Sequence, residues 1–235
     1  MAAAQTVDWL IDQIVHLGSP FNDAAHKAHH SSPEEAQRDF FKAIMKEQIG
    51  EVITIAARYK NDWQNWREAE TGFSPLRFAQ DSLSFQSFVQ LCGMGAEKNE
   101  DYGNGWSPFL FAVNYGDRTF IDYTLGHKPA LDALAVTDGK GHTATALHLA
   151  IERRDFETVE QLIEHGADTG VKANTRHGLL TPQEYAEARH ETKLAEMLSL
   201  APQIRQLHEE RFAPYVAALR TAPKPALKIA MKLAA

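Results

Sequence analysis

The clearest pattern of apolar and polar positions in this chain lies between Thr145 and Asp168. Its first half predicts a short helix capped by Thr145 and followed by a polar turn at residues 152–155. Its second half predicts a helix that begins at Phe156 and ends before Gly166, in the left-handed position typical of a C-cap. Neither helix can bury its apolar face alone. Those faces consist of Leu147, Leu149 and Ala150 in the first helix, and of Phe156, Val159, Leu162 and Ile163 in the second.

The same pattern recurs along the chain. Ser74-Pro75-Leu76 leads to Ala79, Ser107-Pro108-Phe109 leads to Ala112, and Thr181-Pro182 leads to Ala186. Measured at the residue after the capping Ser or Thr, these starts lie at 75, 108, 146 and 182, which gives intervals of 33, 38 and 36. A fifth, polar-started unit at Asp39 precedes them by 36 residues. The insertions of five and three residues fall in the loops between helix pairs.

These residues carry a resemblance to a known family. The runs TALHLA, V-x-x-L-I and HGAD are similar to the ankyrin repeat, a unit of about 33 residues. The resemblance covers about 165 of the 235 residues and implies an all-α fold: a solenoid of stacked helix–turn–helix units with helical N- and C-terminal caps. The expected segments are an N-terminal cap at 1–36, repeats at about 37–70, 71–103, 104–141, 142–177 and 178–200, and a C-terminal cap and basic tail at 201–235.

The two ends of the chain are read as caps. Residues 1–18 have no basic residue, and Asp8 and Asp12 interrupt their apolar run, so they predict an amphipathic helix rather than a signal peptide. That helix either covers the first repeat or mediates self-association. Beyond Pro202, one helix is expected around Leu207 and a second after Pro214. The tail at 220–235 is basic and amphipathic, and it is either disordered, docked on the array, or a weak membrane-surface or partner-bound helix.

Charge and cysteine content indicate which kinds of partner and which cellular compartment to expect. The formal net charge of −7 argues against nucleic-acid binding, which needs a basic face. No stable membrane insertion is expected. The single cysteine, Cys92, fits a reducing compartment and lies where the repeat needs a buried apolar residue, so we interpret it as a packed thiol rather than a nucleophile. The expected location is the cytoplasm, or a host cell if the protein is a delivered effector.

Catalytic chemistry is not indicated by any motif. The sequence has no phosphate loop, nucleophile elbow or dinucleotide fingerprint, so we expect no catalytic residue, no cofactor and no enzyme. The alternative is an enzyme or metal-dependent protein that uses the repeats as a docking platform. Its metal site would be the segment with His26, His29 and His30, although the spacing lacks the glutamate that a hydrolytic zinc site needs. The resemblance implies a structural role for His148, between repeat loops.

Protein binding is the function that the resemblance implies. Loops at 61–66 and 101–106 hold more aromatic residues than folding requires, and these either pack under a neighbouring repeat or form exposed anchors. The inserted loop at 126–141 predicts a longer finger, or is simple drift. The predicted partner-binding residues are Trp63, Trp66, Tyr102 and Trp106 in the fingers, and Asp81, Asn114, Tyr115, Glu152, Arg153 and Arg189 at the ends of first helices.

Overall fold

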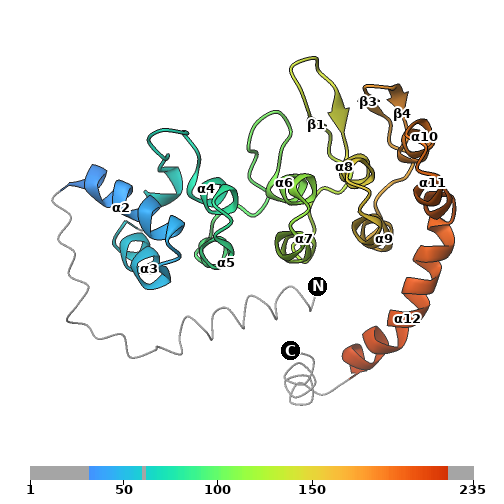
Figure 1. Ribbon diagram of the computed structural model, residues 1–235. Helices are drawn as coiled ribbons and strands as arrows, with labels where there is room; N and C mark the ends of the chain where they lie inside the picture. Colours follow the sequence, from blue (N-terminus) through green and yellow to red (C-terminus); the bar gives the residue numbers. More distant parts are fainter. Residues whose placement is uncertain (1–31, 60–61, 222–235) are drawn as a thin grey trace. The chain divides into compact units, whose positions relative to one another are not determined.

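The computed structural model describes residues 32–59 and 62–221, with side chains up to Pro214. Backbone contacts divide the chain into two compact units, with the boundary between Pro129 and Ala130. This boundary falls inside the inserted loop at 126–141. Each unit consists mainly of short helices in pairs, with strands confined to small hairpins (Figure 1). The predicted all-α repeat fold is therefore confirmed.

The first unit contains successive helix pairs, and helices of neighbouring pairs pack on each other. Within a pair, a tight turn joins the first helix to the second, and the longer loops lie on the side of the first helices (Figure 1). The predicted boundary between cap and first repeat, at 36/37, falls inside the first of these helices. The elements are α2 (Pro33–Met45), α3 (Ile49–Arg58), a 3₁₀ turn (Trp63–Asn65), α4 (Pro75–Asp81), α5 (Phe85–Gly93), α6 (Pro108–Tyr115) and α7 (Arg118–Leu125).

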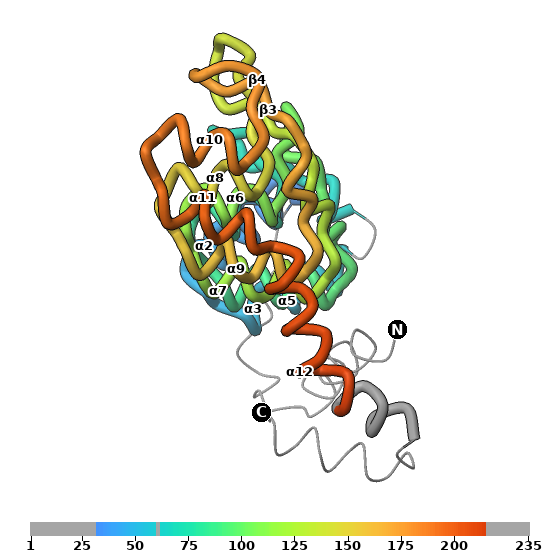
Figure 2. The backbone as a smooth tube through the Cα atoms, turned by 90° about the vertical axis from the view of Figure 1, so that its right-hand side faces the viewer, coloured from blue at the N-terminus to red at the C-terminus, as the bar shows by residue number. Residues whose placement is uncertain are grey.

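The second unit adds two antiparallel hairpins and a long final helix. In the hairpins, Ala135 lies opposite Ala144, and Ala173 lies opposite Leu180. Both hairpins project on the side of the first helices (Figures 1 and 2). The elements are β1 (Ala135–Val136), β2 (Thr143–Ala144), α8 (Ala146–Glu152), α9 (Phe156–Glu164), β3 (Ala173–Thr175), β4 (Gly178–Leu180), α10 (Pro182–Ala188), α11 (Thr192–Ser199) and α12 (Ala201–Thr221).

Hydroxyl caps explain where most first helices begin. The side chains of Ser32, Ser74, Ser107 and Thr181 each accept a hydrogen bond from the backbone N–H three residues on, with proline at the first helical position. Thr181 and Glu184 complete a reciprocal capping box. Thr145 differs, because its hydroxyl makes no cap bond and instead contacts His148. The predicted start sites at Ser74, Ser107, Thr145 and Thr181 are thus confirmed, although the Thr145 hydroxyl makes no cap bond. Asp39, the predicted start of the first unit, instead lies inside α2, which begins at Pro33.

The turns between paired helices share one backbone feature. Each contains a residue with a positive φ angle, in the left-handed region that glycine adopts most readily. Only one of these residues is a glycine. The five are Glu47 (51°), Leu83 (55°), Gly116 (69°), Arg154 (57°) and His190 (62°).

The final helix corrects a prediction made from proline. α12 runs through Pro214 as a single helix, where two helices were expected. A proline inside a helix removes one backbone hydrogen bond, and residues 209–214 are exposed, so water can bond the carbonyl that is left without a donor. Near its start, α12 packs on α9 and α11 (Figure 2). Arg205 donates there to the carbonyls of Ile163 and, through a short bond, Ala167.

Candidate functional site

The tryptophans of the first finger loop are core residues. Trp63 is only 3% exposed and Trp66 only 8%, and both rings pack on Phe40, with centroid distances of 5.9 and 5.3 Å. The ring of Tyr59 also contacts Trp66, with centroids 5.2 Å apart. The prediction that these rings are exposed binding anchors is therefore wrong. They belong to a loop in the sequence, but in the structure they pack on Phe40 of α2.

Tyr102, in the second finger loop, is also buried and fully bonded. Its hydroxyl donates to Gln80 Oε1 at 3.0 Å, and the Gln80 amide donates to the Pro108 carbonyl at 2.8 Å. Arg77 donates to the Tyr102 carbonyl at 2.6 Å. Burial raises the pKa of the Tyr102 phenol well above its usual value. Tyr102 therefore joins two repeats, and its predicted role as an exposed anchor is wrong. Trp106 is half-buried, and its backbone pairs with that of Gly103 and Tyr102.

The first-helix ends of the first unit are exposed, as predicted. Asp81, Asn114 and Tyr115 all lie on the surface, and the Tyr115 side chain is 57% exposed. Its ring packs on Phe111, with centroids 4.6 Å apart. An exposed aromatic ring that packs on a neighbour in this way is typical of interface anchors.

Leu83 is an exposed apolar residue that the sequence reasoning missed. It is 65% exposed and has a φ angle of 55°, in a conformation that costs a leucine about 1–2 kcal/mol. The matching turn of the next repeat has Gly116 at this position, with a φ angle of 69°. A leucine immediately after a helix, where glycine or asparagine is usual, was the available signal.

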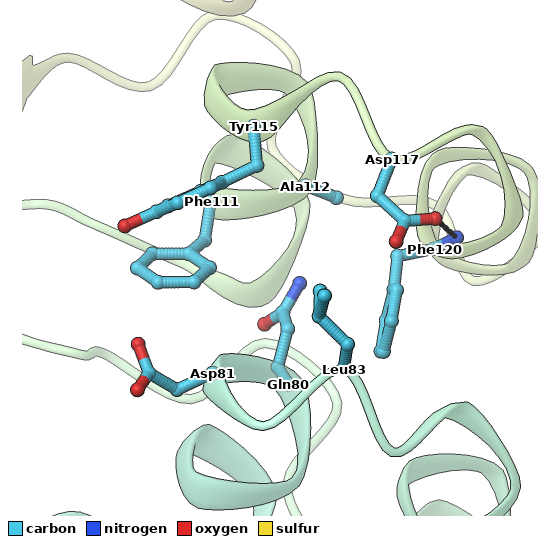
Figure 3. Close-up of a pocket in the computed structure, with 8 residues that line it drawn as sticks. All are labelled: Gln80, Asp81, Leu83, Phe111, Ala112, Tyr115, Asp117 and Phe120. Atoms are coloured by element: carbon cyan, nitrogen blue, oxygen red, sulfur yellow. Dashed lines mark hydrogen bonds between the residues drawn. The ribbon is translucent and has the colours of Figure 1, made fainter.

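Leu83 and Tyr115 line one groove in the first unit. The groove has a volume of about 110 Å³ and lies between the α4–α5 turn and the α6–α7 turn (Figure 3). Its floor is apolar, while a carboxylate lies toward each end. The lining residues are Gln80, Asp81, Leu83, Phe111, Ala112, Tyr115, Asp117 and Phe120.

The two carboxylates of the groove differ in their surroundings. Asp117 caps α7, and its Oδ1 accepts from the N–H groups of Thr119 and Phe120 at 3.0 and 3.3 Å. The positive end of that helix offsets part of its charge. The Asp81 carboxylate makes no hydrogen bond or ion pair with any side chain or backbone group that the structure describes. It is therefore the groove's more available negative charge.

The predicted binding residues of the second unit are largely occupied by each other. Tyr185 donates to Glu152 Oε2 at 2.6 Å, and Arg189 reaches the Glu152 carbonyl at 3.3 Å and its carboxylate at 3.8 Å. Burial, then the bond to Glu152, raises the pKa of Tyr185 to about 12. Glu152 and Arg189, which were predicted as partner-binding residues, thus connect α8 to α10. Arg153 is exposed.

The inserted finger is an ordered turn. His142 Nδ1 lies 2.7 Å from Asp138 Oδ2, and this bond is the main reason that the Asp138 pKa falls to about 2. The Lys140 N–H also donates to Asp138, at 2.9 Å. Since Asp138 is fixed by bonds within its own loop, the groove at Leu83 and Tyr115 remains the better-formed candidate site.

The residues that were considered as candidates for catalysis or metal binding have environments that suit a structural role. Burial raises the pKa of the Cys92 thiol to about 12, which leaves it protonated and inert at neutral pH. His148 is buried and bonded on both ring nitrogens. Among residues 32–59 and 62–221, no group of His, Cys, Asp and Glu side chains could hold a metal ion. His26, His29 and His30 lie outside the described residues.

A comparison with known families identifies the repeats of this chain. Residues 76–173 match the family model of ankyrin repeats in three copies, so this stretch consists of ankyrin repeats. The helix pairs before and after that stretch have the same helix–turn–helix organisation. No curated protein matches the sequence, so no specific member of the family is identified. No helix within the described part of the chain is long and apolar enough to cross a membrane.

Proposed function

We propose that this protein binds a partner protein through the surface formed by Asp81, Leu83, Asn114 and Tyr115, hereafter the Leu83–Tyr115 surface. Ankyrin repeats are generally protein–protein interaction modules and are typically not enzymes. A fold alone does not locate a binding site. The observation that carries the proposal is the exposed Tyr115 ring, packed on Phe111 beside the groove.

The composition of the Leu83–Tyr115 surface supports this role. Interface centres combine aromatic and aliphatic anchors with a polar rim, and a few anchors contribute most of the binding energy. Here Tyr115 and Leu83 supply apolar area, while Asp81 and Asn114 supply the rim. Three of the four finger aromatics, Trp63, Trp66 and Tyr102, cannot contribute in this way because they are buried.

We infer that the protein acts by binding a partner rather than by catalysing a reaction. An adaptor, an inhibitor or a delivered effector each works by occupying a partner, and the inert Cys92 and the bonded His148 support such a role over catalysis. We also infer a cytoplasmic location, because a single buried cysteine has no partner for an intramolecular disulfide and suits a reducing compartment.

Affinity capture with surface variants tests the proposal. The full chain is immobilised and the proteins it retains are quantified by mass spectrometry, beside Tyr115→Ala, Leu83→Ala and Leu207→Ala. Leu207 in α12 is the matched control, because it is 65% exposed, the same as Leu83. We expect a retained protein to fall roughly tenfold with each surface variant, which corresponds to about 1.4 kcal/mol, and to be unchanged with the control. If both surface variants retained the same proteins in the same amounts as the unchanged chain, the proposal that this surface binds the partner would be rejected.

A further inference from the structure

The groove between Leu83 and Tyr115 has features that specify what it binds. We propose that it takes a segment of a partner protein that places one bulky aliphatic side chain between Leu83 and Tyr115, with Lys or Arg residues beside it. This inference rests on the proposed protein-binding function and adds the chemistry of the partner segment. Three observations support it: the size of the groove, the cost of its Leu83 conformation, and its charge.

The size fits a single side chain. An apolar cavity of about 150 Å³ accepts a benzene molecule, so a groove of about 110 Å³ accommodates one branched aliphatic group. Its walls are apolar, since Phe111, Ala112 and Phe120 contribute alongside Leu83 and Tyr115. Phe120 is itself held by edge-to-face packing on Phe85, with centroids 5.2 Å apart. The floor is therefore built from a buried and packed side chain.

The backbone conformation of Leu83 also indicates that a partner covers this residue. Three other turns of the chain place a charged or polar residue at this left-handed position, and one places a glycine. Leu83 therefore combines an unfavourable backbone angle with an exposed apolar side chain, and neither stabilises the free protein. Backbone strain of this kind is concentrated at binding sites. A partner that covers Leu83 would make use of the side chain that the free protein leaves in water.

The charge of the groove selects a basic neighbour for the apolar anchor. Asp81 and Asp117 lie on opposite sides of the apolar residues (Figure 3), and the described residues that line the groove include no Lys or Arg. Arg118 directly follows Asp117 in the sequence, but its guanidinium pairs with Asp122 at 3.5 Å. An acidic segment would bring like charges together, whereas Lys or Arg on either side of the anchor would pair with a carboxylate.

A peptide selection on the full chain tests this chemistry. Random dodecapeptides displayed on phage are selected on the immobilised protein, and one enriched peptide is then synthesised with a fluorescent label. We expect enriched sequences to contain Leu, Ile or Met flanked by Lys or Arg. We expect Leu83→Ala to weaken the labelled peptide at least tenfold in fluorescence anisotropy, whereas Leu207→Ala leaves its affinity unchanged.

Charge variants separate the electrostatic part of the inference. Asp81→Asn with Asp117→Asn removes both carboxylates, and asparagine keeps the N-cap of α7. This double variant should weaken the peptide and reduce the salt dependence of its affinity. Glu160→Gln with Glu196→Gln, on exposed positions of α9 and α11, removes the same charge elsewhere and should have no effect. Circular dichroism confirms that each variant is folded, and Leu83→Gly provides a second test at Leu83 that relieves the backbone angle.

Each other occupant of the groove gives a distinct result. If the chain's own tail occupied the groove, Lys228→Glu with Lys232→Glu in the full chain would raise the affinity of the peptide. If a second copy occupied it, sedimentation would show a dimer that Leu83→Ala dissociates. Either result overturns the inference. Leu83-dependent peptides without basic residues would overturn it while the proposed function stands. If neither peptide binding nor affinity capture changed when Leu83 or Tyr115 is replaced, both proposals would be rejected.

Discussion

Replacing His148 with alanine should destabilise the second unit more than any exposed histidine change. The carbonyl of Leu180 can only accept, so His148 Nε2 carries the proton and donates to it at 3.0 Å. Nδ1 must then accept from the Thr145 hydroxyl at 2.8 Å. The ring is buried and packs on Tyr185, with centroids 5.5 Å apart. His148 therefore joins α8 to the start of the next repeat.

The expected magnitude follows from these contacts. Each hydrogen bond contributes about 0.5–1.5 kcal/mol net, and a buried partner left unsatisfied costs about 1–3 kcal/mol. His148→Ala leaves the Thr145 hydroxyl and the Leu180 carbonyl without their shared partner. We expect the free energy of unfolding to fall by about 3 kcal/mol, a large part of the roughly 5–15 kcal/mol typical of a protein. His165→Ala is the control, because His165 is exposed, its side-chain hydrogen bond lies within its own helix turn, and its ring makes only a loose contact with His208, with centroids 6.4 Å apart.

Urea unfolding followed by circular dichroism measures the difference. With a slope of about 2–3 kcal/mol/M, a loss of about 3 kcal/mol lowers the midpoint by about 1 M. Because repeat arrays can unfold in parts, native-state hydrogen exchange should locate the loss in α8 and α10. A midpoint within about 0.3 M of the His165→Ala value would refute the reasoning, since the bonds of His148 would then contribute little.

Three further predictions concern titration, reactivity and the turns. Burial lowers the pKa of His148 below 6.5, so the unfolded chain takes up a proton first as pH falls, and stability should decline below about pH 6.5. His148→Gln should flatten that decline in urea midpoints measured from pH 7.5 to 5. Cys92, with a pKa of about 12, should react with iodoacetamide at least ~100-fold more slowly in native protein than in urea, and equal rates would contradict its burial. Leu83→Gly should leave the free energy of unfolding unchanged or raise it by up to ~1 kcal/mol, whereas a clear loss would mean that Leu83 packs in the core.

The repeated helix pairs could be predicted because their signals are local. Ser74-Pro75, Ser107-Pro108 and Thr181-Pro182 each specify a helix start within four residues, and the structure has helices at all three. Whether the finger tryptophans are buried or exposed could not be predicted in the same way. Whether Trp63 and Trp66 are anchors or core depends on Phe40, more than twenty residues earlier in the chain, and no local pattern records that contact.

The candidate site was predictable only in part. Asp81, Asn114 and Tyr115 follow from their place at first-helix ends, and they are exposed as that place indicates. Glu152 and Arg189 occupy equivalent places but bond each other, because the neighbouring repeat offers a partner of opposite charge. Leu83 was missed because its importance lies in a backbone angle and an exposure, which only the folded chain supplies.

Arg205 has a consequence for how this array can change length by gene duplication. From α12 it donates to the carbonyls of Ile163 and Ala167, at the end of α9, so α10 and α11 lie between the bonded elements in sequence. A helix pair duplicated between Ala167 and Ala201 would separate Arg205 from both acceptors and leave those carbonyls to find new partners. A pair duplicated before Thr145 would leave this bond unchanged. Gains of repeats are therefore better tolerated before Thr145 than after Ala167, and the C-terminal end of the array should be its most constant part in length.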